Sequence, residues 1–409
     1  APCDRIAPWV SDEAHTAAFC MSVMKKHVLR AHAPGWVRVV RRPWVRTASF
    51  LGLRILPRGR QIVFVSVHPD DPDALVILEY LARHSSRPLV WLGVDELPAD
   101  ELLDPLARSR VTLGRLHSVA GAYSLLTSSL VFHTHGIFGI RRATGRQVVI
   151  NVWHGDGPKV MRPDPIATTF MVTGVQAFGL RRMAVLGLPA ERLLTTGRPR
   201  VDDIHRPPHA AEQSASMRAL GLDDRPVVWW LPTWRESASG PVALGQSFEE
   251  WFTPDAFARV RDRYQFVVKP HPNSPPQAWP EPWRVLTASE ITRAKVRWYR
   301  VLASAAAIIT DYSSVWSDFL ESSVPLAFIV PDAEDYARER GFYMEDWRRL
   351  LPGPLLAGPG ELHDFLAGLA ERDHQPRRIA VAHALGSNNG AGATQRLLTA
   401  LSEHDVEWR

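Results

Sequence analysis

The chain of 409 residues has only two cysteines and no long apolar run. Cys3 and Cys20 are too few for a disulfide framework and form no CxxC zinc motif, which suits a reducing compartment. No apolar stretch approaches the roughly 20 residues that span a bilayer. No signal-peptide pattern is visible, so we expect neither a spanning helix nor a secretory leader. Hydrophobic residues make up 45% and charged residues 22%, which indicates a folded protein.

Acidic residues are absent from residues 25–60, which contain ten lysines and arginines. Tryptophan and phenylalanine are interleaved with this positive charge, and Pro34, Pro43 and Pro57 interrupt any long helix. Cationic and aromatic side chains together fit the anionic inner surface of a membrane. A solvated basic face and a nucleic-acid patch are the alternatives. We interpret residues 1–59 as a membrane-docking segment and expect no nucleic-acid partner.

From residue 60 onward, apolar runs alternate with helical patterns. Strands are predicted at residues 62–65, 89–92, 130–132, 147–153 and 170–173, and helices at 74–83, 120–126 and 175–186. Further strands are predicted at residues 227–231, 265–269, 285–286, 306–309 and 326–330. This alternation predicts parallel sheets covered by helices. We therefore expect an α/β fold of the glycosyltransferase-B type, with two Rossmann-like domains facing a central cleft.

The predicted domains follow from where the alternation pauses. A polar, proline-rich stretch at residues 206–218 is the expected linker. It separates a first domain, residues 60–205, from a second domain, residues 219–380, and residues 381–409 are expected to form a C-terminal helix.

One predicted strand breaks directly into a helix at Thr310-Asp311-Tyr312-Ser313-Ser314. Such a break leaves backbone N–H groups at the carboxyl end of the strand, and two hydroxyls beside them make an anion site. The alternative is an ordinary helix N-cap. We predict that Ser313 and Ser314 face a phosphate, while Asp311 caps the helix or orients Ser313.

A second motif, Asn151 to Lys159, follows another buried strand. Gly155 and Gly157 permit a tight turn just after His154, with Asp156 and Lys159 close by in the chain. The pattern favours a general base or a phosphate-contacting imidazole. An ordinary loop histidine is the alternative.

Three more motifs carry cationic side chains at predicted strand ends. Arg198 and Arg200, in Gly197-Arg198-Pro199-Arg200, could clamp a phosphate or lie on the surface of a rigid turn. Arg235, in Pro232-Thr233-Trp234-Arg235, is a candidate pyrophosphate ligand. A histidine fixed between two prolines, in Lys269-Pro270-His271-Pro272, indicates a site where Lys269 or His271 meets a diphosphate.

In their order and spacing, these motifs resemble the CDP-glycerol glycerophosphotransferases of teichoic-acid synthesis, a glycosyltransferase-B-like family. The resemblance covers roughly residues 60–400 and extends to the segments 332–343 and 389–391. It implies that His154 is the base toward the acceptor hydroxyl, and that His271, Arg235, Ser313 and Ser314 hold the diphosphate of the donor. The chain departs from the family after His154-Gly155, where Asp156-Gly157-Pro158 replaces the usual Thr-Pro-Leu before Lys159.

The resemblance implies transfer of glycerol phosphate, or a related alditol phosphate, from a CDP-alditol to a hydroxyl of a lipid-linked or polymeric acceptor, with release of CMP. Residues 60–205 would then be the acceptor domain and residues 219–380 the nucleotide-donor domain, on the cytoplasmic face of the membrane. CDP-glycerol and CDP-ribitol both fit. No cofactor is expected, and the clusters His68 to Asp71 and His133 to Gly136 lack a full set of metal ligands. The alternatives are a nucleotide-sugar glycosyltransferase or epimerase of the same fold, and a non-catalytic membrane- or nucleic-acid-binding protein.

Overall fold

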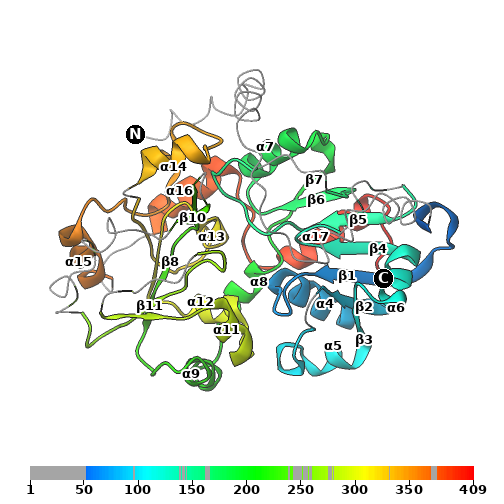
Figure 1. Cartoon of the computed structure of the whole chain (residues 1–409), viewed down its shortest axis with the longest axis horizontal. Helices are drawn as coiled ribbons and strands as arrows, with labels where there is room; N and C mark the ends of the chain where they lie inside the picture. The colour runs from blue at the N-terminus through cyan, green and yellow to red at the C-terminus, as the bar shows by residue number, and fades with distance from the viewer. Residues whose placement is uncertain are drawn as a thin grey trace. The chain divides into compact units, whose positions relative to one another are not determined.

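The computed structural model (Figure 1) describes residues 52–409, apart from residues 95–96, 138–139, 141–142, 144, 162–165, 238–239, 243–250, 252–256, 258–259, 275–278, 280, 331 and 370–374. Most of the basic segment predicted at residues 1–59 therefore lies outside the described residues. The described chain divides into two compact units. Unit 1 comprises Gly155–Val160 and Asp203–Asn389, and unit 2 comprises residues 52–154, Met161–Asp202 and Gly390–Arg409.

Within the described residues, unit 2 contains a seven-stranded parallel sheet in the order β3-β2-β1-β4-β5-β6-β7. Its strands are β1 (Gly59–Ser66), β2 (Leu89–Gly93), β3 (Val111–Arg115), β4 (Ser128–His133), β5 (Val148–Asn151), β6 (Phe170–Thr173) and β7 (Leu193–Thr195). Its helices are α4 (Pro72–His84), α5 (Pro105–Arg110), α6 (Val119–Thr127), α7 (Gln176–Leu186) and α17 (Ala393–Glu403). The chain leaves the sheet in opposite directions from the neighbouring strands β1 and β4. This reversal is the switch point at which open α/β sheets bind ligands, beyond the carboxyl ends of the strands.

Both faces of the unit 2 sheet are buried, and β1 shows why. Ile62 and Phe64 pack in one hydrophobic cluster, whereas Val63 and Val65 pack in another. Successive side chains of a strand point to opposite faces, so a continuous apolar run serves both clusters.

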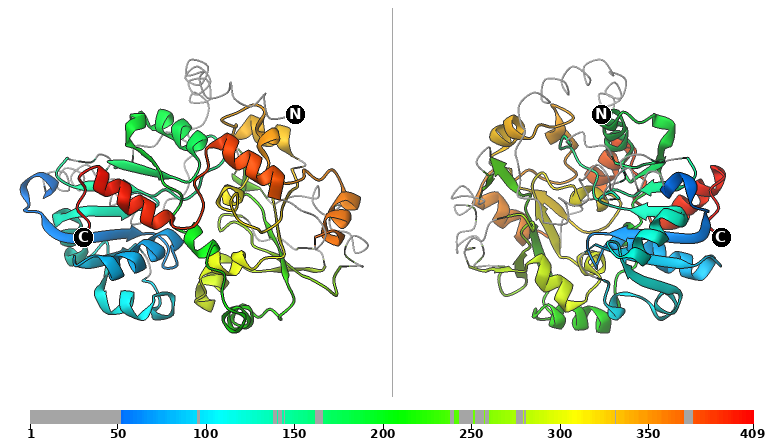
Figure 2. Two further views of the ribbon diagram at one scale, coloured as in Figure 1. Left: turned by 180° about the vertical axis from the view of Figure 1, so that it is seen from behind. Right: turned by 45° about the vertical axis from the view of Figure 1, so that its right-hand side comes forward.

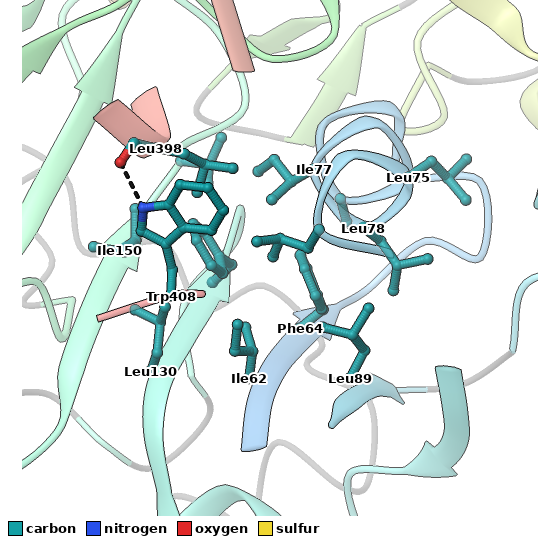
Figure 3. Packing of buried hydrophobic residues seen from close by; sticks show 14 of the residues in the cluster. Ile62, Phe64, Leu75, Ile77, Leu78, Leu89, Leu130, Ile150, Leu398 and Trp408 are labelled. Atoms are coloured by element: carbon teal, nitrogen blue, oxygen red, sulfur yellow. Dashed lines mark hydrogen bonds between the residues drawn. The ribbon is translucent and has the colours of Figure 1, made fainter. Parts of the chain in front are cut away.

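The C-terminal segment completes the first of these clusters. Leu398 of α17 and Trp408 lie among the side chains of β1, α4 and neighbouring strands (Figure 3). The Trp408 indole donates a hydrogen bond of 2.7 Å to the carbonyl of Leu398. The end of the chain is thus part of the core of unit 2.

In the described part of unit 1, five parallel strands have the order β12-β11-β8-β13-β14. They are β8 (Val227–Leu231), β11 (Gln265–Val268), β12 (Trp283–Val285), β13 (Ala307–Thr310) and β14 (Leu326–Phe328), with the antiparallel pair β9 (Arg235–Ser237) and β10 (Gly240–Val242). The helices are α8 (Val201–Ile204, at the boundary of the units), α9 (Ala210–Ala219), α11 (Ala288–Ala294), α12 (Trp298–Ala303), α13 (Val315–Asp318), α14 (Ala333–Glu339), α15 (Pro359–Ala367) and α16 (Gln375–Leu385). Central β8 again marks a switch point, because β11 and β13 flank it.

The parallel α/β sheets predicted from the alternation are present, but two stretches differ from the prediction. The expected linker at residues 206–218 is largely helix α9, because alanine, glutamate and glutamine favour helix once the paired prolines have passed. Residues 381–409 do not form one helix. They contain the end of α16, in unit 1, and α17, which returns to the sheet of unit 2 (Figure 2).

Candidate functional site

Three histidines gather at the carboxyl edge of the unit 2 sheet. His68 follows β1, His135 follows β4 and His154 follows β5, and these three strands are neighbours. The rings of His135 and His154 stack with 4.7 Å between centroids and 9° between planes. His68 meets His135 edge-on at 5.4 Å. The cluster lies beside the β1–β4 switch point.

Backbone strain marks the residue before His154. Trp153 has a φ of 65°, which is rare for a bulky residue and costs on the order of 1–3 kcal/mol. Its N–H donates to Asn151 Oδ1 at 3.0 Å, and its carbonyl accepts from Arg198 Nη2 at 3.0 Å. The Arg182 guanidinium lies 5.1 Å from the Trp153 ring. Several groups thus hold one strained residue, as at functional sites where strain places a side chain.

Arg198 and Arg200 brace this turn from inside the unit. The sequence predicts a phosphate clamp, but Arg198 is fully buried and pairs with Asp73 at 2.6 Å. Arg200 donates to Asp73 Oδ1 through its backbone N–H at 3.0 Å, and its Nη1 donates to the carbonyl of His154 at 3.0 Å. The two arginines therefore fix the backbone on either side of His154, and the phosphate clamp stays a prediction.

His154 is held in its neutral form by its surroundings. As a whole residue, His154 is exposed. Loss of hydration around the imidazole nevertheless lowers the pKa of His154 well below its ordinary value, and His135, Arg198 and Arg182 lower it further. Burial likewise lowers the pKa of His135 to about 3. An unprotonated imidazole at neutral pH can accept a proton.

In unit 1, Arg235 is the centre of an internal ion-pair network. Arg235 pairs with Asp311 at 2.6 Å and with Asp332 at 2.7 Å, and its guanidinium lies 4.9 Å from the ring of Tyr312. Arg235 and Asp311 are buried. Arg235 is thus engaged by two carboxylates and links the ends of β8 and β13, and its role as a pyrophosphate ligand stays a prediction.

Asp311 organises the turn that follows β13. Its carboxylate accepts from the backbone N–H of Thr233 at 2.9 Å and of Ser313 at 3.2 Å. The N-cap residue of α13 is Ser314, and no side chain caps that helix. Of the two predicted roles, Asp311 therefore orients Ser313 and does not cap α13. Its full burial also argues against a direct contact with a substrate.

The loop after His154 belongs to unit 1 and packs on this turn. A Cβ atom placed on Gly157 would lie 3.1 Å from Ser314 Cβ. Ser317 Oγ donates to the carbonyl of Asp156 at 2.7 Å, and the N–H of Tyr343 donates to the carbonyl of Pro158 at 2.7 Å. Asp156, which the sequence places close to His154, is fully buried, and its expected contact with substrate stays a prediction.

Lys159, at the end of the same loop, is half-buried. Burial lowers its pKa to about 8, Asp311 opposes this shift, and Arg340 and Arg235 reinforce it. The ammonium thus loses its charge close to physiological pH, which makes it sensitive to any anion bound nearby.

The accessible polar groups of unit 1 follow β11 and β13. His271 is exposed, and its ring stacks on that of Trp234 at 6.0 Å. Its Nδ1 accepts from the N–H of Asn273 at 3.2 Å, so the neutral ring carries its proton on Nε2 as a donor. Lys269 is half-buried, with Nζ 5.7 Å from the Trp298 ring. Ser313 and Ser314 are also half-buried.

Sequence reasoning did not single out Asp73, Asp332 or Trp153, and it weighed His135 only as a metal ligand. Their signal was weak, because an acid in a first helical turn and a tryptophan after a strand are common. His135 was visible as a strand-end histidine, but nothing local related it to His154. Among the described residues, no group of three or more His, Cys, Asp or Glu side chains could hold a metal ion. No helix in the described part of the chain is long and apolar enough to cross a membrane.

Two Rossmann-like parallel sheets with polar clusters at their carboxyl edges define a glycosyltransferase-B-like α/β protein. The likeness to the solved wall teichoic acid polymerase TagF supports this class: the TM-score is 0.66 at 18% identity, covering 97% of this chain and 98% of that one. A TagF variant soaked with CDPG gives a TM-score of 0.64 at 17% identity.

The chain belongs to the CDP-glycerol:poly(glycerophosphate) glycerophosphotransferase family, whose pattern matches residues 183–401. The resemblance inferred from the motifs is therefore confirmed. A teichoic acid glycerol-phosphate transferase of Staphylococcus aureus is 24% identical over 79% of this chain and 87% of its own length. A teichoic acid poly(ribitol-phosphate) polymerase of Bacillus spizizenii is 29% identical over 41% of this chain. The match spans only 27% of that polymerase.

Proposed function

We propose that this protein transfers glycerol phosphate, or a related alditol phosphate, from a CDP-alditol to a hydroxyl of a lipid-linked or polymeric acceptor. CMP is the other product. Membership of the family supports the donor class. The observation that carries the proposal is the path of the His154 motif, because Gly157, three residues after the strained turn at His154, packs against Ser314. The loop that follows the proposed base in the chain therefore packs on the proposed phosphate-binding turn within unit 1.

In the proposed reaction, the acceptor oxygen attacks the phosphorus that bears the alditol. A new O–P bond forms, the bond from that phosphorus to the bridging oxygen breaks, and CMP departs with the electron pair. Neutral His154 accepts the proton of the acceptor hydroxyl, a contribution of about 10²- to 10⁴-fold for a positioned base. Little covalent chemistry is needed from the protein, so positioning and charge stabilisation supply the rest.

In this proposal, the accessible groups of unit 1 bind the diphosphate of the donor. The Nε2–H of His271, the ammonium groups of Lys269 and Lys159, and the hydroxyls of Ser313 and Ser314 are donors of the kind that bind phosphate oxygens. Arg235 and Asp311 keep the Ser313 turn in place, and Arg198 and Arg200 do the same for His154. These four buried residues act through others in this proposal.

The direct test measures CMP release from CDP-glycerol and from CDP-ribitol, with a lipid-linked acceptor analogue. We expect release with at least one donor and a loss of about 10²-fold or more in kcat for His154→Ala. His84→Ala, which removes an exposed histidine at the far end of α4, is the matched control and should be silent. Equal rates for His154→Ala and the parent protein would refute the proposal, as would the absence of CMP with both donors.

The basic segment is proposed to bring the enzyme to its acceptor on the membrane surface. Ten positive charges without an acidic residue in residues 25–60 favour anionic lipid. Co-sedimentation with vesicles containing an anionic lipid should fall in a chain that lacks residues 1–51, whereas turnover of a soluble acceptor should persist. Loss of turnover together with membrane binding would contradict a role limited to docking.

A further inference from the structure

We infer that His135 is a positioning residue for His154, with its imidazole acting as the platform that sets the plane of the base. This inference rests on the proposed role of His154. The two rings are nearly parallel, with 9° between planes and 4.7 Å between centroids. They come from the ends of adjacent strands, β4 and β5, so the contact is built into the register of the sheet.

A chain of hydrogen bonds fixes the platform itself. Thr134 Oγ1 donates to Asp71 Oδ2 at 2.6 Å and lies 2.9 Å from His135 Nδ1. A hydroxyl can donate one hydrogen bond, and Thr134 donates its hydrogen bond to Asp71. In the contact with His135, the donor must therefore be an N–H of the imidazole ring. Neutral His135 therefore carries its proton on Nδ1. The carboxylate of Asp71 also accepts from the N–H of Ala74 at 3.1 Å, which ties the chain to the start of α4.

The surroundings oppose a positive charge on either ring. His68 lies edge-on to His135, and Arg198 and Arg200 enter from the turn after β7. Arg182 approaches from α7. On the other side, α4 presents the carboxylates of Asp71 and Asp73, which Thr134 and the two braced arginines already engage. The platform is thus a neutral aromatic surface, and a second imidazole stacked on it is kept neutral as well.

Two substitutions at His135 distinguish the contribution of the stacked ring from that of its hydrogen bond. His135→Phe keeps a stacking face, whereas His135→Asn keeps a polar atom near the position of Nδ1 and loses the face. We expect His135→Ala and His135→Asn to lower kcat by about tenfold to hundredfold with little change in the KM for the CDP-alditol, the size expected for a misplaced group. His135→Phe should retain kcat within a fewfold of the parent protein. His84→Ala, which removes another stacked histidine of unit 2, is the control and should be silent.

The outcomes are distinct. If His135→Phe is as inactive as His154→Ala, His135 takes part in the chemistry and the inference is wrong. If His135→Ala turns over like the parent protein, the platform has no role. Should His135→Ala fail to fold, Thr134→Val, which removes only the hydroxyl of a buried residue, takes its place and should lower kcat severalfold without changing KM.

An NMR titration of the His154 ring tests the contact even if no donor reacts. We expect its midpoint to move up toward the ordinary histidine range in His135→Ala and to stay low in His135→Phe. An unchanged midpoint in His135→Ala would overturn the inference. Absence of CMP release from the parent protein, with the expected NMR shifts, would contradict the proposed function alone.

Discussion

Single residues of the site fall into two groups, those that reach solvent and those that are buried and paired. His154 and His271 are exposed, and Ser313, Ser314, Lys159 and Lys269 are half-buried. Arg198, Arg235 and Asp311 are buried in ion pairs. A charged side chain is stable in the protein interior only when ion-pair or hydrogen-bond partners compensate its loss of hydration. The second group therefore determines whether the first is in place.

Replacement of Arg235 by methionine should destabilise the protein. It leaves the carboxylates of Asp311 and Asp332 without their cation, and breaking a buried ion pair costs about 3–5 kcal/mol. Urea unfolding measures this loss. Arg338→Met, which breaks the exposed pair with Asp335, is the control and should change stability little. Similar stabilities for the two variants would contradict the bracing role.

The acidic limb of the pH profile of kcat/KM should reflect the protonation of His154. A base must be unprotonated, and the pKa of His154 lies well below its ordinary value. Activity is therefore kept as pH falls below the usual histidine range and is lost only at lower pH. Measured kcat/KM, which reflects the free enzyme, should show this limb below pH ~6.5. A limb at or above that pH would mean that another group is the base.

The basic limb of the same pH profile should reflect the deprotonation of Lys159, whose pKa is about 8. The ammonium is protonated below that pH and neutral above it, so attraction for the donor diphosphate weakens as pH rises through this value. We expect kcat/KM for the CDP-alditol to fall there. Lys159→Arg should abolish the fall, because arginine remains charged. A limb that persists in the arginine variant would assign it elsewhere.

Local sequence patterns could place His154, His271 and the serine turn at strand ends, because each follows an apolar strand directly. They could not show which groups Arg198 and Arg235 contact. Whether an arginine meets a ligand or an internal carboxylate depends on a partner such as Asp73, which lies more than a hundred positions from Arg198 in the chain. Strand alternation predicts that both residues lie near strand ends, but it does not say what lies opposite them.

At the scale of elements, the loop Gly155–Val160 is the decisive piece, and its close approach to α13 depends on glycine. An alanine Cβ at position 157 would lie 3.2 Å from Ser314 Cα, so the loop or the serine turn must shift. Gly157→Ala should lower kcat/KM by about tenfold or more, because positioning is sensitive to sub-ångström shifts. The assay of CMP release measures this effect.

Gly360→Ala provides the matched control for Gly157→Ala, since its new Cβ would enter open space within α15. It should leave turnover unchanged and favour the helix slightly. If Gly157→Ala also left turnover unchanged, the position of the loop would not determine the position of the serine turn.

Single helices and strands were easier to predict than their assignment to one unit or the other. The run Val227 to Leu231 is a strand as expected, because an unbroken apolar segment of this length suits a buried parallel sheet. The short strand β7 was missed, since three residues carry too little pattern. The assignment of residues 155–160 to unit 1 follows from contacts with Ser317 and Tyr343, far along the chain, which no local pattern encodes.

On the scale of the whole molecule, the two units differ in how the chain builds them. The described part of unit 2 includes residues 52–154 and also Gly390–Arg409, so its sheet and its last helix come from opposite ends of the chain. Asp202 fixes the returning segment by accepting from the backbone N–H groups of Gly392 at 2.8 Å and Thr394 at 3.0 Å. Leu397, Leu401 and Trp408 then complete the hydrophobic cluster.

A chain that ends at residue 389 should lose unit 2 selectively. It lacks buried leucines of α17 and Trp408, and removal of one such side chain alone costs about 2–5 kcal/mol. Limited proteolysis should then cut within residues 60–154 and 161–202 while unit 1 stays protected. Hydrogen exchange should show the same contrast, and equal protection of both units would contradict it.

This return of the chain has a consequence for how the protein is made. A ribosome delivers β1 and α4 early, yet the residues of α17 that cover them emerge only after the whole of unit 1. Domains made first ordinarily fold first during synthesis. Here the usual order is reversed. Unit 1 can reach its native state on the nascent chain, whereas unit 2, with the proposed base, can mature only once α17 has emerged.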